Sequence, residues 1–216
     1  MELIAQFIDI FLHLDQHLTL LINQYGVWVY AILFAIIFCE TGLVVMPFLP
    51  GDSLLFVVGA LAATGALDVQ LVILLLMAAA FLGDNTNYWI GRFIGPRVFT
   101  QESRWLNRRH LEKTEAFYEK HGGKTVLFAR FLPIFRTFAP FVAGIGHMIY
   151  NRFVLFSFLG AIVWINSLVF LGYFFGNIPI VKNNLTVAIL GIIVLSLMPG
   201  LIHFVREKTR GSSPRA

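Results

Sequence analysis

The stretch LFARFLPIFRTFAPFVAG, from Leu127 to Gly144, places two arginines and two prolines in an apolar run that contains no acidic residue. An unpaired guanidinium in hydrocarbon costs at least a few kcal/mol, and proline breaks helices because it lacks a backbone N–H. Arg130 and Arg136 therefore need partners from another part of the chain, or from a bound anion.

The composition is that of an integral membrane protein built from helices. Of the 216 residues, 58% are hydrophobic and 13% are charged, whereas soluble domains carry about 25% charged residues. The first basic residue is Arg92, and basic residues then concentrate in the segment 97–122 and in the tail 205–216. By the positive-inside rule, both basic regions and the C-terminus are expected in the cytoplasm.

The apolar segments divide into full spans and broken segments. Four of them approach the ~20 residues of one helical crossing: 27–46, 69–94, 153–175 and 185–204. Residues 47–65 and 125–149 are interrupted by proline and glycine, which is typical of re-entrant segments. Residues 1–25 are predicted to form an amphipathic helix at the membrane edge.

The distribution of charge predicts how the broken segments enter the membrane. If the basic segment and the basic tail are both cytoplasmic, an even number of crossings must lie between them. The last two spans supply two crossings, so the segment 125–149 must enter and leave on the cytoplasmic side. The same reasoning places both ends of the segment 47–65 on the outer side. We therefore expect two re-entrant hairpins of opposite orientation.

A weak internal similarity supports two repeats, 27–95 and 125–176. The run WIGRFIG resembles VFLGYFFG, and the comparison aligns Gly91 with Gly172. Small residues at this spacing also simply allow close helix packing in membranes. If the repeat is real, it matches the inverted repeats of secondary transporters, whose broken segments form the substrate site at the bilayer midplane.

Four ionisable groups lie within the apolar and broken parts: Glu40, Asp52, Arg130 and Arg136. The arginines are predicted to bind a phosphate group, because guanidinium groups match phosphate oxygens. Glu40 and Asp52 are predicted to bind protons, since a buried carboxylate without a cation partner favours its protonated form. The open alternative is that the four groups form structural ion pairs, although buried pairs seldom stabilise more than packed apolar side chains do.

Three further residues are predicted to have accessory roles at the site: Asp84, Ser53 and Thr137. Asp84, with Asn85 and Asn87, either lines the cavity or satisfies its neighbours at a helix interface, and the interface is favoured. Ser53 and Thr137 each follow a charged residue and are predicted to cap a broken helix, with substrate contact as the alternative.

Catalytic and metal-binding patterns are missing from the sequence. It contains no GXSXG, HEXXH or Walker motif, and His147 is the only histidine near the apolar core. A single cysteine, Cys39, excludes an intrachain disulfide and a cysteine-rich zinc site. We therefore expect no enzyme activity, no metal and no cofactor.

Three stretches, FCETGLVVMPFLPGDSLL, KHGGKTVLFARFLPIFRTFAPFVAGIGHM and GYFFG, resemble the DedA family of membrane proteins. The resemblance covers nearly the whole chain. Its most specific motif is an arginine, two residues, a proline, two residues and a second arginine, here Arg130, Pro133 and Arg136. The acidic pair of the family falls on Glu40 and Asp52.

The resemblance implies a multi-pass protein of the bacterial cytoplasmic (inner) membrane that depends on the proton-motive force and supports envelope integrity. Family members are linked to the return of undecaprenyl phosphate across this membrane. The leading hypothesis is a flippase that carries this lipid from the outer to the inner leaflet. Alternatives are a phospholipid scramblase, a proton-coupled cation or drug antiporter, and a structural assembly factor. Expected partners are an anionic lipid, the bilayer and protons but no nucleic acid, and a homodimer is compatible with the family.

Overall fold

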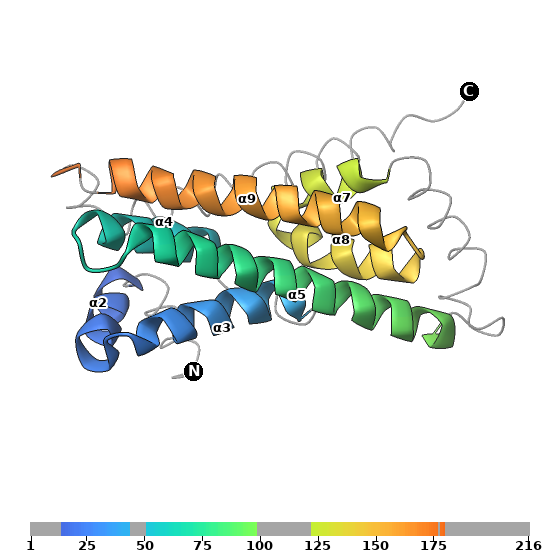
Figure 1. Cartoon of the computed structure of the whole chain (residues 1–216), viewed down its shortest axis with the longest axis horizontal. Helices are drawn as coiled ribbons and strands as arrows, with labels where there is room; N and C mark the ends of the chain where they lie inside the picture. The colour runs from blue at the N-terminus through green and yellow to red at the C-terminus, as the bar shows by residue number, and fades with distance from the viewer. Residues whose placement is uncertain (1–13, 44–50, 99–121, 177, 180–216) are drawn as a thin grey trace, which may run out of the picture.

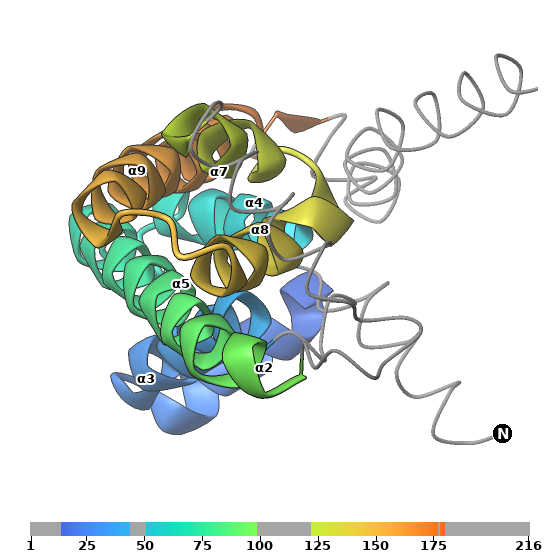
Figure 2. The same ribbon diagram turned by 90° about the vertical axis from the view of Figure 1, so that its right-hand side faces the viewer.

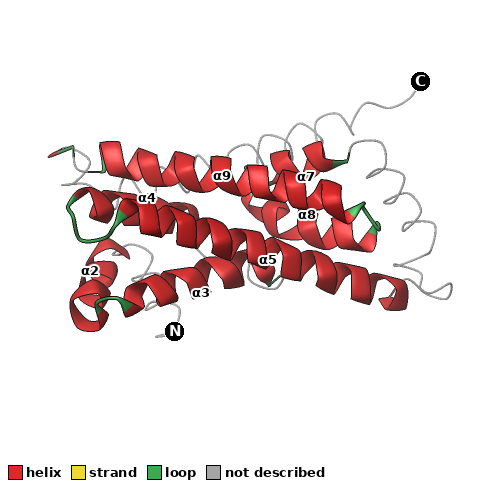
Figure 3. Ribbon diagram, viewed as in Figure 1, coloured by secondary structure: helices red, strands yellow, loops and turns green. Residues whose placement is uncertain are grey.

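The structure, a computed structural model, describes residues 14–43, 51–98, 122–176 and 178–179. Over these residues the chain forms seven helices and no strand (Figures 1 and 3). The helices are α2 (Leu14–Tyr25), α3 (Trp28–Gly42), α4 (Gly51–Ala63), α5 (Val69–Val98), α7 (Gly123–Ala129), α8 (Pro133–Ile145) and α9 (Tyr150–Phe175). The final span 185–204, the tail 205–216 and most of the basic segment 97–122 lie outside the described residues.

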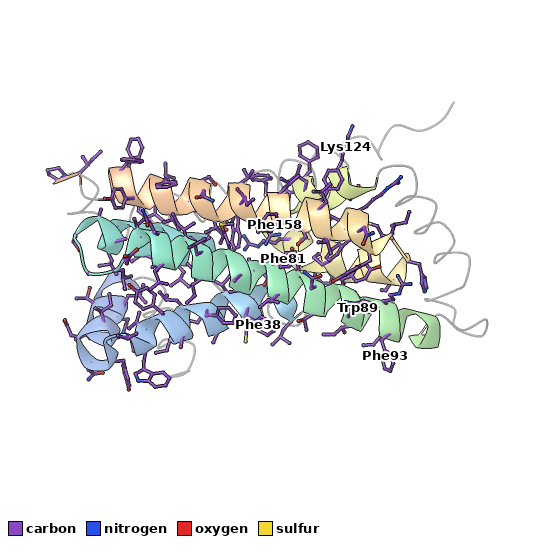
Figure 4. All side chains as sticks on the ribbon, in the orientation of Figure 1. Phe38, Phe81, Trp89, Phe93, Lys124 and Phe158 are labelled. Atoms are coloured by element: carbon purple, nitrogen blue, oxygen red, sulfur yellow. The ribbon has the colours of Figure 1, made fainter. Side chains whose placement is uncertain are left out.

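Two of the helices, α5 and α9, are long and apolar enough to cross a membrane. Their apolar stretches, Val69–Ile94 and Tyr150–Phe175, are 26 residues each. At about 1.5 Å per residue, each exceeds the roughly 30 Å hydrocarbon core of a bilayer. The two helices run side by side in opposite directions, and Phe81 meets Phe158 edge to face with ring centroids 5.8 Å apart (Figure 4). These are the spans predicted at 69–94 and 153–175.

The helices α3 and α4 run in opposite directions and form a hairpin, whereas a full span was predicted at 27–46. α3 has 15 residues and ends at Gly42, where Leu43 takes an extended conformation. At about 22 Å it is too short to cross the hydrocarbon core. The backbone N–H of Asp68, just after α4, donates to the hydroxyl of Tyr30 near the start of α3 at 2.9 Å. The chain therefore returns to the end of the molecule from which α3 started (Figure 1).

The predicted broken segment 125–149 contains a second hairpin, α7 and α8, at the opposite end of the molecule (Figure 1). Pro133 begins α8, a position at which a backbone N–H has no helical partner to bond. Pro140, which was expected to break the segment, lies inside α8. Its ring removes the helical hydrogen bond to the carbonyl of Arg136, but the helix continues to Ile145.

The second helix of each hairpin packs onto the long helix of the other half, α4 on α9 and α8 on α5. Seen along the bundle, α4 and α8 occupy its centre (Figure 2). Four glycines lie directly against backbone carbonyls of the facing helix: Gly91 against Phe141, Gly144 against Tyr88, Gly172 against Phe56 and Gly59 against Val169. The aligned glycines Gly91 and Gly172 thus make equivalent contacts, each with a phenylalanine carbonyl.

The outer surface of the bundle is apolar. Trp89 and Phe93 lie on the outside of α5 (Figure 4) and are 51% and 63% exposed. Such a surface is stable when hydrocarbon surrounds the protein, because no apolar area then faces water.

Candidate functional site

Broken helix ends from the two hairpins meet in the middle of the molecule (Figure 1). α3 and α7 end there, and α4 and α8 begin there. The four charged residues predicted for the site lie at these ends: Glu40 in the last turn of α3, Asp52 in the first turn of α4, Arg130 directly after α7, and Arg136 in the first turn of α8. The helix breaks therefore concentrate charge in the interior.

Arg136 connects the two hairpins through two carboxylates. Its Nη2 donates to Oε1 of Glu40 at 2.5 Å and its Nη1 donates to Oδ1 of Asp52 at 2.6 Å. Glu40 and Arg136 are 1% and 6% exposed. Asp52 is the most accessible of the three, with 17% of its side chain exposed. The structure thus brings the predicted acidic pair onto this arginine.

Arg130 pairs with Asp84 and not with the predicted acidic pair. Its Nη1 donates to Oδ2 of Asp84 at 2.5 Å and to the carbonyl of Ser157 at 3.2 Å. The hydroxyl of Ser157 donates to the same Asp84 oxygen at 2.6 Å. The four predicted groups therefore do not pair only among themselves, because Arg130 pairs with Asp84, which the unbroken helix α5 carries through the middle of the molecule.

The two asparagines beside Asp84 have separate partners. Nδ2 of Asn87 donates to the carbonyls of Thr41 and Thr137 at 3.1 and 2.7 Å, which ties α5 to both hairpins. Asn85 accepts a hydrogen bond from the Tyr150 hydroxyl at 2.9 Å. Asp84 consequently belongs to the ionic site and not to an interface with these neighbours.

The predicted helix caps are not observed at Ser53 and Thr137. Leu132 is the N-cap residue of α8, so Thr137 lies inside that helix. Ser53 is the third residue of α4, and its buried hydroxyl has no hydrogen-bond partner among the described residues. Both residues nevertheless lie next to the charged groups in the chain and are buried.

Trp164 on α9 contacts both arginines, and the sequence reading missed it. The guanidinium carbons of Arg136 and Arg130 lie 4.4 and 5.4 Å from the centroid of its ring. Its Nε1–H donates to Oδ1 of Asp52 at 2.9 Å. Cations at such distances from an aromatic face are attracted by the ring quadrupole.

The spacing of small and polar residues along α9 could have revealed this buried helix face from the sequence. Ser157, Gly160 and Trp164 are three and four residues apart, so they project from one side of α9. Gly160 leaves room for Arg130, since a Cβ at this position would lie 3.0 Å from the arginine Cδ. A small and polar stripe on an otherwise apolar span indicates a face that points into the protein.

Some buried donors of the arginines remain available for a ligand. Among the described residues, no acceptor reaches Nε or Nη2 of Arg130, or Nε of Arg136. A buried donor without an acceptor is costly, and an anion in this place would satisfy it. The same part of the chain holds no group of three or more His, Cys, Asp or Glu side chains suited to a metal ion.

Comparison with known proteins assigns the family. Residues 49–174 match the family model described as the VTT domain. The chain is 56% identical over 211 residues to protein DedA of Escherichia coli strain K12, covering 96% of each chain. This chain belongs to the DedA family. It is also similar to the inner membrane protein YqjA of the same strain, at 38% identity over 154 residues, 70% of this chain and 69% of the relative.

A further similar protein is an uncharacterised membrane protein of Mycobacterium leprae strain TN. It is 45% identical over 179 residues, 81% of this chain and 80% of the relative. No solved structure matches the chain. The matched VTT domain runs from just before α4 into the end of α9 and contains Asp52, Asp84, both arginines and Trp164, whereas Glu40 precedes it.

Proposed function

We propose that this DedA family protein is a proton-motive-force-dependent transporter, not an enzyme, that moves undecaprenyl phosphate from the outer to the inner leaflet of the bacterial cytoplasmic membrane. The proposal depends on one observation, that two carboxylates hold the buried Arg136 where broken helices meet. A phosphate group presents similar oxygens and can replace these carboxylates on the guanidinium. The lipid tail stays in the bilayer, so only the headgroup needs a polar path.

The helix ends around Arg136 favour an anion. The first turn of α8 carries both the positive end of its helix dipole and a cationic side chain. Glu40 lies at the C-terminal end of α3, where the dipole is unfavourable for a carboxylate. If Glu40 takes up a proton when a phosphate replaces it on Arg136, its unfavourable contact with the dipole is lost while a negative charge stays beside Arg136.

The charge balance of the site supports proton coupling. Three carboxyl groups, those of Glu40, Asp52 and Asp84, pair with two guanidinium groups. When all are ionised, the cluster carries one excess negative charge, and a bound phosphate adds more. Because uncompensated buried charge is costly, binding of a phosphate should require proton uptake by the carboxyl groups.

The arrangement of hairpins supports alternating access from the two leaflets. We assign α3–α4 and α7–α8 as re-entrant hairpins of an inverted repeat, with α5 and α9 as spans. In support, the hairpins come from opposite ends of the molecule, and the paired glycines make equivalent contacts in both halves. By the positive-inside rule, Arg92 and Lys124 favour a cytoplasmic location for the α7–α8 end.

Proteoliposomes that contain a fluorescent polyprenyl phosphate would test the proposal. Flipping is measured by exposure of the label to a quencher, with and without a pH gradient. We expect Arg136→Ala to lower the rate at least tenfold, since a charge-assisted hydrogen bond contributes about 1.5–3 kcal/mol. The exposed Arg152→Ala is the matched control and should keep the wild-type rate. Equal rates for Arg136→Ala and wild type would exclude a role for Arg136 in transport.

The same assay separates the alternatives. A scramblase would move phospholipid and ignore the pH gradient, and an antiporter would move cations without lipid. A structural assembly role is favoured by one observation, that each arginine already has a carboxylate partner. In that case the exchange of Glu40→Arg with Arg136→Glu should restore function, whereas a phosphate site would not tolerate it.

A further inference from the structure

Trp164 joins the two halves of the ionic site. The face of its ring lies against the guanidinium groups of Arg136 and Arg130. Its edge donates a hydrogen bond to Oδ1 of Asp52, the same oxygen that accepts from Nη1 of Arg136 at 2.6 Å. The residue is 3% exposed. One buried side chain thus contacts the anion-binding groups through its face and a proton-binding group through its edge.

Trp164 also occupies a different kind of position in the fold from the groups that it contacts. Asp52 and Arg136 lie in the first turns of broken helices, whereas Trp164 lies in the middle of the unbroken helix α9. On the same face of α9, Gly160 accommodates the side chain of Arg130 and Ser157 binds its partner carboxylate. α9 therefore provides a continuous surface against which the ends of both hairpins are held.

We infer that Trp164 is a positioning residue that links proton uptake at Asp52 to the release of Arg136 for the phosphate headgroup, an inference that rests on the proposed function. While Asp52 is ionised, the indole N–H and Arg136 share its oxygen, and Arg136 is held on the carboxylate. When Asp52 takes up a proton, its attraction for Arg136 is lost. The ring face then keeps the guanidinium in place to receive the phosphate.

Two other carboxyl groups lie close to Asp52 and can take up protons in the same experiment, those of Glu40 and Asp84. Glu40 faces the site from α3 and shares Arg136 with Asp52. Asp84 and Arg130 form their own pair against the same indole ring. A test must therefore separate the proton of Asp52 from those of Glu40 and Asp84.

Infrared difference spectroscopy of the purified protein separates them. The C=O stretch of protonated carboxyl groups is followed against pH, and the band lost in Asp52→Asn reports Asp52. We expect Trp164→Phe to move the midpoint of this band to higher pH by about one unit, because a hydrogen bond to the ionised form is removed. Trp28→Phe is the matched control, since Trp28 is 73% exposed, and should leave the midpoint unchanged.

Binding of a fluorescent short-chain polyprenyl phosphate in detergent micelles tests the ring face. Below the midpoint, Trp164→Phe should bind within about twofold of wild type, because the ring is kept. Trp164→Leu should bind roughly tenfold more weakly, because the cation–π contact is lost. An unshifted midpoint in Trp164→Phe, or equal affinities for the two variants, would overturn the inference. If Trp164→Phe shifts the midpoint but the wild-type protein binds no polyprenyl phosphate, the proposed function is overturned and the link between Trp164 and Asp52 stays supported.

Discussion

Asp84 and Arg130 form an ion pair in which each buried residue neutralises the charge of the other inside an apolar bundle. Asp84 is 1% exposed and Arg130 is 3% exposed, and Ser157 donates to the carboxylate from the adjacent helix. Removal of one partner from such a pair leaves an uncompensated charge, which is more costly than removal of both. Each residue of the pair therefore depends on the other for its counter-charge, whether or not Arg130 also binds substrate.

At this position, Asp84→Asn should lower the free energy of unfolding by about 3 kcal/mol, because Arg130 loses its counter-charge. The double variant Asp84→Asn with Arg130→Gln should recover at least half of the loss. Chemical denaturation in detergent, followed by circular dichroism, measures both. Asp68→Asn is the matched control, since the exposed Asp68 accepts from Gln70 and Leu71 at the start of α5 and asparagine caps helices equally well. Strictly additive losses in the double variant would contradict this interpretation.

A residue of the site could be predicted from the sequence when it was an ionisable side chain within an apolar run. Glu40, Asp52 and Arg136 met this condition, and the structure brings them together. Asp84 was assigned to the wrong partners and Trp164 was missed, because their contacts depend on how α5 and α9 cross the hairpins. A tryptophan in an apolar span gives no sign of its partners until the facing helices are known.

Among the helices, the long spans were predictable and the hairpin α3–α4 was not. The predicted spans 69–94 and 153–175 correspond to α5 and α9, with ends that differ by up to four residues. The run 27–46 is nearly all apolar and Glu40 is its one charged residue, so its hydropathy predicts a continuous crossing and not an end of α3 at Gly42. Length and hydropathy alone cannot distinguish a full crossing from half of a hairpin.

Glycine contacts hold these helices together. A Cβ at Gly144 would collide with the carbonyl of Tyr88, and one at Gly172 with the carbonyl of Phe56. Because backbone atoms cannot yield as flexible side chains do, Gly144→Ala and Gly172→Ala should each destabilise the protein by about 1–3 kcal/mol. Thermal unfolding in detergent measures the loss, and Leu171→Ala is the control because Leu171 is exposed on α9.

The two glycine changes should also add when combined, since one contact joins α8 to α5 and the other joins α4 to α9. Stability equal to wild type in either variant would show that the facing helices are not in close contact at that glycine.

In the whole molecule, each hairpin reaches the centre from its own end and packs on the long helix of the other half. The ion pairs of Arg136 then join the two hairpins, so a change at the site is transmitted to both ends. Under the proposed function, rearrangement of one hairpin against α9 or α5 would open the site to one leaflet at a time. This organisation differs from the sequence-based topology in one testable respect, the side of the membrane on which α3 begins.

Cysteine labelling decides between these topologies. In a Cys39→Ser background, single cysteines replace the exposed residues Val27, Ala66 and Asn151, and a membrane-impermeant maleimide is added to spheroplasts before and after lysis. Val27 lies just before α3 and Ala66 lies just after α4, at the same end of the molecule. Both Val27→Cys and Ala66→Cys should therefore react in intact spheroplasts, whereas Asn151→Cys should react only after lysis. A full crossing at 27–46 would instead place Val27 with Asn151. Reaction of Val27→Cys only after lysis, with Ala66→Cys reactive before it, would therefore exclude the α3–α4 hairpin.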